Sequence, residues 1–282
     1  ELAAAESLFR EALALREALY PELHADVAES VNNLAIVLVE RTDPGQAEET
    51  ERLERRGLAL RRELFGEDHL DTLQSRNNFA VFLIKRGRPE DLAEAEGHLR
   101  DVLAGRRRRL GNDHPTVANS LNNLANLLDD LGREAEAIAL FREAIRAWTA
   151  SLGADHPRVA TGLYGLYAAL KGSGDLAGAE QALRASLAID ERHLPPGHPY
   201  LATDRLKLGE LMLAADRPAG GAPGWGWALA AVCEAGDAGA EAGGDRPFLD
   251  PVLDVGLDPV LDGGGQGRRA VDEGHSRSRA VQ

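Results

Sequence analysis

The amino-acid sequence predicts an all-α fold, a right-handed α-solenoid of antiparallel helix pairs. Apolar residues recur with the spacing of one helical face over most of residues 1–216. A histidine also recurs at intervals of 45, 45, 42 and 42 residues, at His24, His69, His114, His156 and His198. A fixed period in this range is the signature of a solenoid. Aromatic residues make up only 5% of the chain, so the core must be built mainly from alanine and leucine, which are the best helix formers.

The clearest copy of the repeating unit covers residues 113–152. Its first helix is expected to begin at Asp113, whose carboxylate can accept the free amide hydrogens of the first turn, and to end at Gly132. Each helix carries one apolar stripe: Val117, Leu121, Leu124, Ala125 and Leu128 on the first, and Ala137, Phe141, Ala144, Ile145 and Trp148 on the second. Two stripes cannot close a core alone, so neighbouring copies must supply the missing surface.

The string Leu121-Asn122-Asn123-Leu124-Ala125 and the small and large residues that follow it resemble a tetratricopeptide repeat. The 42-residue period and the Asp-His-Pro corner resemble the kinesin light chain subtype, which is also abundant in bacterial signalling proteins. The resemblance covers roughly residues 1–216. It implies a scaffold that binds proteins or peptides, with acidic or aromatic-acidic peptides as the ligands of some members. The heavy use of arginine, alanine and glycine also favours a bacterial source.

We expect the solenoid to cover residues 1–235 and a disordered tail rich in glycine, aspartate and arginine to cover residues 236–282. Residues 1–22 are interpreted as the second helix of a truncated repeat, which indicates a piece of a longer protein. Full repeats are expected at 23–67, 68–112, 113–154 and 155–196, and a degenerate last repeat with a half-length capping helix at 197–235. The Asp-Pro-Val-Leu-Asp motif occurs twice in the tail, at residues 250–254 and 258–262. It is either a linear ligand for a partner or part of an out-of-frame translation.

The second helix of the first full repeat departs from the pattern. Thr50, Glu54 and Gly57 occupy the positions at which the clearest copy has Ala137, Phe141 and Ala144. A carboxylate in place of a phenyl ring weakens an apolar layer. The sequence therefore predicts a looser layer at this helix.

Composition excludes several classes of function. The net charge of −14 argues against binding to nucleic acid or to an anionic membrane surface. The single cysteine, Cys233, excludes a disulfide framework within the chain. The sequence has no nucleotide-binding loop and no motif of a metalloprotease or serine hydrolase. We therefore expect no enzyme activity, no cofactor and a cytoplasmic location.

The recurring histidines could suggest a metal site, but each belongs to a different repeat. Packed helices lie about 10 Å apart, whereas a metal ion needs its ligands at about 2 Å. We therefore expect no metal and assign the histidines a structural role at the corners between helices.

Asparagine pairs recur at the same position of three successive repeats, at Asn32-Asn33, Asn77-Asn78 and Asn122-Asn123. An amide side chain both donates and accepts hydrogen bonds, which suits the backbone of an extended peptide. The second residue of each pair is expected to bond between repeats. The first is expected to line the concave face that first helices form in this family, so the predicted groove contains Asn32, Asn77, Asn119, Asn122 and Asn126, with Arg76 and Lys85 as its main cations.

These observations together predict a protein-interaction scaffold that binds a partner protein or extended peptide in its concave groove. Two alternatives remain open at this stage. The chain could be the sensor or regulatory region of a larger bacterial signalling enzyme, such as a kinase, a signal-transduction ATPase or a caspase-like protease. It could also be a self-association module that acts through the C-terminal end of the solenoid.

Overall fold

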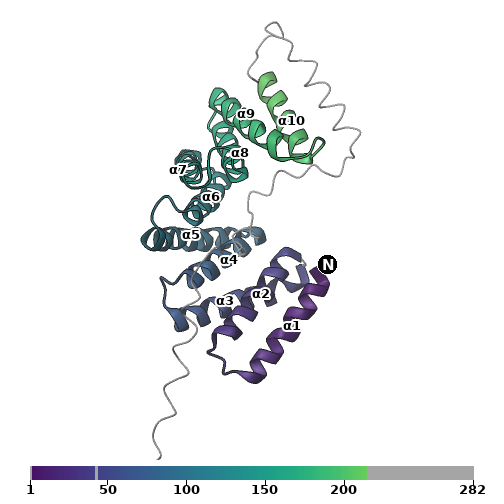
Figure 1. Ribbon diagram of the computed structural model, residues 1–282, viewed down its shortest axis with the longest axis vertical. Coiled ribbons are helices and arrows are strands. Elements are labelled where there is room, and N and C mark those ends of the chain that lie inside the picture. The colour runs from purple at the N-terminus through teal and green to yellow at the C-terminus, as the bar shows by residue number, and fades with distance from the viewer. Residues whose placement is uncertain (1, 42–43, 215–282) are drawn as a thin grey trace, which may run out of the picture.

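The computed structural model describes residues 2–41 and 44–214, and nearly all of them lie in helices (Figure 1). The α-helices are α1 (Leu2–Leu19), α2 (Ala25–Arg41), α3 (Ala47–Phe65), α4 (Leu70–Arg86), α5 (Pro89–Leu110), α6 (Pro115–Asp130), α7 (Glu134–Leu152), α8 (Pro157–Gly172), α9 (Leu176–His193) and α10 (Pro199–Ala214), with a 3-10 turn, η1 (Pro44–Gln46), before α3. The described residues contain no strand, which confirms the all-α class. The expected capping helix and tail lie outside these residues.

Each helix packs against its neighbours in the sequence, from α1 and α2 to α9 and α10. Figure 1 shows the pairs stacked along the long axis of the molecule, with α1 at one end and α10 at the other. The first helices of the repeats are α2, α4, α6, α8 and α10, and the second helices are α1, α3, α5, α7 and α9. The α-solenoid is therefore confirmed.

Every first helix begins at a corner histidine, which caps it. The histidine Nδ1 accepts the backbone N–H two residues further on, at 3.1–3.2 Å, and the donors are Asp26, Asp71, Thr116, Arg158 and Tyr200. The prediction that Asp113 caps α6 was wrong, because His114 is the cap residue and its ring takes that role. The structural role assigned to the corner histidines is confirmed.

A second recurring contact joins neighbouring repeats, and we call it the arginine clamp. An arginine near the end of a second helix donates to a backbone carbonyl ten residues on and to a serine hydroxyl fourteen residues on, both at the start of the next first helix. Its three copies are Arg16 with Asp26 O and Ser30 Oγ, both at 2.9 Å, Arg61 with Asp71 O and Ser75 Oγ, both at 3.0 Å, and Arg106 with Thr116 O at 3.5 Å and Ser120 Oγ at 2.7 Å. The arginine thus gives a carbonyl of the first turn an additional donor, on top of its bond within the helix, and holds two repeats together.

The fourth repeat replaces the clamp with an aromatic contact. Trp148 stands where the earlier repeats have the arginine, and Gly162 stands where they have the serine. A Cβ atom at Gly162 would lie 2.9 Å from Trp148 Cζ3, so the close approach of the indole requires glycine. The indole Nε1 instead donates to Asn119 Oδ1 at 3.1 Å.

Arg106 provides a test of the clamp. It is 1% exposed and also donates to Gln74 Oε1 at 2.7 Å. We expect Arg106→Met to lower the free energy of unfolding by about 2–4 kcal/mol, because several buried acceptors lose their donor. Arg108→Met is the control, since Arg108 is exposed and pairs with Asp68 at the surface, and it should change stability by less than about 1 kcal/mol. Equal effects of the two variants in urea denaturation would contradict the clamp.

The buried apolar residues form two clusters that divide at α3. The smaller cluster lies on α1, α2 and α3 and includes Leu13, Val31 and Leu60. The larger cluster extends mainly from α4 to α10 and includes Phe79 and Leu208. The division at α3 agrees with the looser layer that its sequence predicted.

Glu54 lies on this helix and is only 2% exposed. Its Oε1 has no hydrogen-bond partner among the described residues. Burial raises the pKa of Glu54 to about 8, although Arg61 partly opposes this shift. The side chain is therefore a neutral carboxylic acid inside the solenoid at neutral pH.

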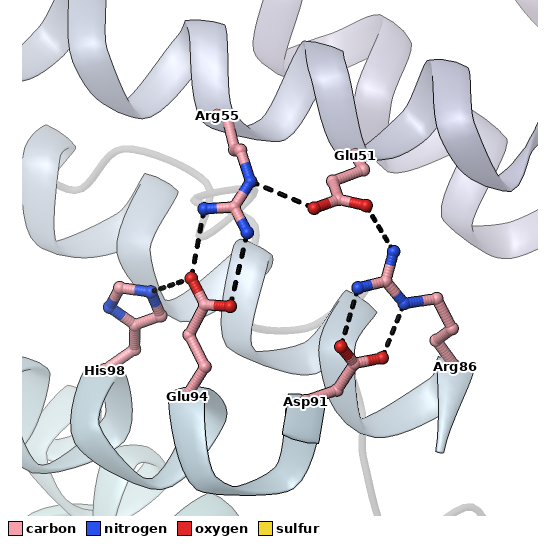
Figure 2. A network of polar contacts seen from close by, with 6 residues as sticks. All are labelled: Glu51, Arg55, Arg86, Asp91, Glu94 and His98. Carbon is pink, nitrogen blue, oxygen red and sulfur yellow. Dashed lines mark hydrogen bonds and ion pairs between the residues drawn. The ribbon is translucent and has the colours of Figure 1, made fainter. Parts of the chain in front are cut away.

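A polar network ties the two clusters together across α3, α4 and α5 (Figure 2). Its members are Glu51, Arg55, Arg86, Asp91, Glu94 and His98. Arg55 donates to Glu51 and Glu94, both at 3.0 Å, and Arg86 bonds Asp91 at 2.7 Å and also Glu51. The two guanidinium groups lie over aromatic rings, Arg55 over Phe79 at 4.7 Å and Arg86 over Phe82 at 5.0 Å. The network therefore adds polar and cation–π contacts where the apolar core is interrupted.

The buried acid predicts an unusual pH dependence of stability. Glu54 ionises near its ordinary value of 4.5 in the unfolded chain but keeps its proton to about pH 8 in the folded chain. Stability is therefore lost as pH rises between these values. We expect Glu54→Leu to raise the free energy of unfolding by a few kcal/mol near pH 8 and by much less near pH 4, at about 1.4 kcal/mol per unit of pKa shift. Chemical denaturation checks this, with Glu63→Leu on the exposed side of α3 as the control. A constant difference between Glu54→Leu and the parent across this pH range would contradict it.

Candidate peptide-binding face

The asparagine pairs join consecutive first helices. Asn78 Nδ2 donates to Asn32 Oδ1 at 3.3 Å, and Asn123 Nδ2 donates to Asn77 Oδ1 at the same distance. The second asparagine of one pair thus bonds the first asparagine of the preceding pair, which confirms the inter-repeat role expected of Asn78 and Asn123. We call the surface of α2, α4, α6 and α8 that carries these residues the first-helix face.

The series of asparagine bonds stops at Asn122. This side chain is 6% exposed, and its buried Oδ1 has no hydrogen-bond partner among the described residues. By the repeat spacing its donor would come from position 165, but a glycine stands there. A Cβ atom at Gly165 would lie 2.4 Å from Phe141 Cε1, so the packing of the phenyl ring excludes any side chain. The fold therefore leaves one acceptor of the series unused.

The remaining predicted asparagines also lie on α6. Asn119 Oδ1 accepts hydrogen bonds from Trp148 Nε1 at 3.1 Å and from Arg158, and Asn126 is 5% exposed. Asn32 and Asn77 are likewise buried, at 6% and 1% exposure. The structure therefore brings the predicted asparagines together on three neighbouring helices, with most of their amides engaged inside the protein.

The two predicted cations lie in different places. Lys85 is on the first-helix face, where its Nζ bonds Glu40 of α2 at 2.9 Å. The structure does not bring Arg76 to this face, because its guanidinium pairs with Asp101 of α5 and with Glu67 at the preceding corner. Lys85 is thus already neutralised, and the face offers a partner less positive charge than the sequence suggested.

Sequence reasoning missed the carboxylates at the end of α6. Asp129 is half-buried, Asp130 follows it, and Glu134 begins α7. Burial and then the charges of Asp130 and Glu134 raise the pKa of Asp129 to about 6. The Asp-Asp pair was visible in the sequence, but its partial burial depends on how α6, α7 and α8 pack.

The described residues contain no group of three or more histidine, cysteine, aspartate or glutamate side chains placed to hold a metal ion. None of the helices in residues 2–41 and 44–214 has both the length and the apolar character needed to cross a membrane. The first-helix face carries buried asparagine amides, which can form hydrogen bonds, and the carboxylates at the end of α6, which can pair with cations.

A stack of helix pairs joined by recurring side-chain contacts is the architecture of a helical-repeat scaffold. Models of the tetratricopeptide repeat match residues 27–71, 88–150 and 130–192. The chain belongs to the tetratricopeptide repeat family. No protein with a curated description matches its sequence.

Solved structures extend the similarity to most of the chain. The structure of BtubC (BKLC) from P. vanneervenii is 21% identical with a TM-score of 0.68, over 87% of this chain and 94% of that one. A putative kinesin light chain from Podospora anserina, with nearly identical repeats, is also 21% identical with a TM-score of 0.60, over 74% of this chain and 93% of that one. The resemblance of the fold to kinesin light chain repeats is therefore confirmed.

Proposed function

We propose that this protein is an interaction scaffold that binds an extended segment of a partner protein along the first-helix face and has no catalytic activity of its own. Tetratricopeptide repeats generally mediate protein interactions. The observation that carries the proposal is Asn122, whose buried amide oxygen continues the asparagine series but has no donor in the part of the chain that the structure describes. Oδ1 is buried in the unbound chain, so the amide must turn outward before a backbone N–H of an extended peptide can donate to it. We also propose a cytoplasmic location.

The proposed binding residues are those on the face itself. They are Asn32, Asn77, Asn119, Asn122, Asn126 and Lys85. Asn32 and Asn77 already bond the next repeat through Oδ1, so they can offer a ligand only the remaining capacity of the amide. The Oδ1 atom of Asn122 keeps its full capacity to accept hydrogen bonds, and α6 is therefore the centre of the proposed site.

Self-association through the C-terminal end has less support. Leu201, Leu208 and Leu211 of α10 are each no more than 4% exposed. These leucines are thus already covered and cannot form the contact with a second copy. Leu206 and Leu213 of α10 are exposed, at 40% and 65%, and two exposed leucines are much smaller than the apolar patch of an interface.

Asn122→Ala tests the proposal, and the same change at the next residue, Asn123, serves as its control. Because Asn122 Oδ1 has no partner in residues 2–41 and 44–214, its removal should leave the midpoint of thermal unfolding nearly unchanged. Partner protein recovered from source lysate by the full chain, quantified by mass spectrometry, should fall about tenfold, as expected for one hydrogen bond of about 1.4 kcal/mol.

Asn123→Ala is the matched control. It removes the bond to Asn77 and should lower the free energy of unfolding by about 1 kcal/mol while the still-folded protein retains its partner. Recovery of the same partners, in the same amounts, by Asn122→Ala and the parent would overturn the assignment of the site.

A further inference from the structure

A cluster of three carboxylates closes one end of the first-helix face. Asp129 and Asp130 end α6, and Glu134 begins α7. None of the three forms an ion pair with another described residue, unlike most acidic side chains in the solenoid. Asp129 and Asp130 also lie at the carbonyl end of α6, where the helix dipole disfavours negative charge. The folded chain therefore places negative charge here without a compensating cation.

The cations nearby are engaged elsewhere. Arg133 pairs with Glu96 and Glu136, and Lys171 of α8 lies 4.0 Å from Glu210 of α10. Gly172 follows Lys171, and a Cβ atom there would lie 3.2 Å from Glu134 Cγ. At this position α8 therefore presents a glycine to Glu134, and no ion pair joins Glu134 to a charged side chain of α8 among the described residues.

The cluster and Asn122 occupy one side of α6. Asn122, Asn126, Asp129 and Asp130 follow the i, i+4, i+7, i+8 spacing of a single helical face. Asn122 and Asp129 are seven residues apart, which is about 10 Å along the helix. An extended peptide covers that distance in about three residues. One ligand segment can therefore contact both the unused amide and the carboxylates.

We infer that the segment bound on this face is basic: an arginine or lysine of the partner pairs with Asp129, Asp130 and Glu134, while a backbone donor about three residues away bonds Asn122 Oδ1 once that amide turns outward. The inference rests on the proposed function and names the chemical class of its ligand. Two independent observations carry it, the unpaired carboxylate cluster and the buried acceptor without a donor. The net charge of −14 favours the approach of such a ligand over long distances. This preference is opposite to that of the family members that bind acidic peptides.

A random dodecapeptide library displayed on phage tests the inference without knowledge of the partner. The full chain, Asp129→Asn/Asp130→Asn and a control are each used to select peptides. The control is Glu48→Gln/Glu63→Gln, which removes the same charge from exposed positions on α3. Removing repulsion among these carboxylates should not destabilise α6, and the control changes only exposed residues of α3, so both variants should fold as the parent does.

We expect peptides selected by the parent and by the control to be enriched in arginine and lysine, and those selected by Asp129→Asn/Asp130→Asn to lose this enrichment. A selected peptide should bind Asp129→Asn/Asp130→Asn about tenfold more weakly than the parent in calorimetric titration, and the difference should shrink in high salt. Binding to the parent should also weaken as pH falls through about 6, because Asp129 then takes up a proton.

Each contrary outcome has a distinct meaning. Selected peptides without basic residues, but lost on Asn122→Ala, would overturn the basic preference and leave the peptide-binding function standing. Basic peptides selected equally by Asp129→Asn/Asp130→Asn would assign the preference to the overall charge and overturn the site. No enrichment above bare resin would overturn the proposed function itself.

Discussion

The junction between the second helix of one repeat and the first helix of the next is the contact on which the rest of the structure depends. A helix pair cannot bury both of its apolar stripes alone, so stability comes from nearest-neighbour interfaces. At three successive junctions an arginine bonds a backbone carbonyl and a serine of the next helix. The corner histidine caps that same helix. Together these contacts fix where each new repeat begins and how it is oriented on the last.

The junctions are not equal in strength. At α3 the apolar core divides into two clusters, and Glu54 is buried there without a hydrogen bond to Oε1. The polar network that contains Arg55 and Arg86 crosses this division. In a one-dimensional array, cooperativity is limited by the weakest interface. We expect the α3 layer to be such an interface, because the apolar core is interrupted there, and its strength to depend on the protonation of Glu54.

The altered packing of the fourth repeat creates the candidate site. Phe141 packs against Gly165 and Trp148 against Gly162, so α8 has no side chain at the positions where α4 and α6 carry an asparagine and a serine. The aromatic core is thereby continued, but the asparagine series loses its next donor and Asn122 Oδ1 stays unpaired. The Asp129, Asp130 and Glu134 cluster lies further along the same helix. A structural substitution in one repeat thus leaves a polar, acidic surface on its neighbour.

The sequence by itself determined the class of fold, the repeat period and the structural role of the corner histidines, because apolar periodicity and spacing are local properties of the chain. It also placed the asparagines together, since residues one repeat apart occupy equivalent positions. Only the tertiary structure decided which of them are already bonded, that His114 rather than Asp113 caps α6, and that Arg76 points toward Asp101. Those outcomes depend on distances between side chains of different helices. A hydrogen bond exists only where the packing brings donor and acceptor within about 3 Å, and the residue opposite Asn122 is set by the neighbouring repeat.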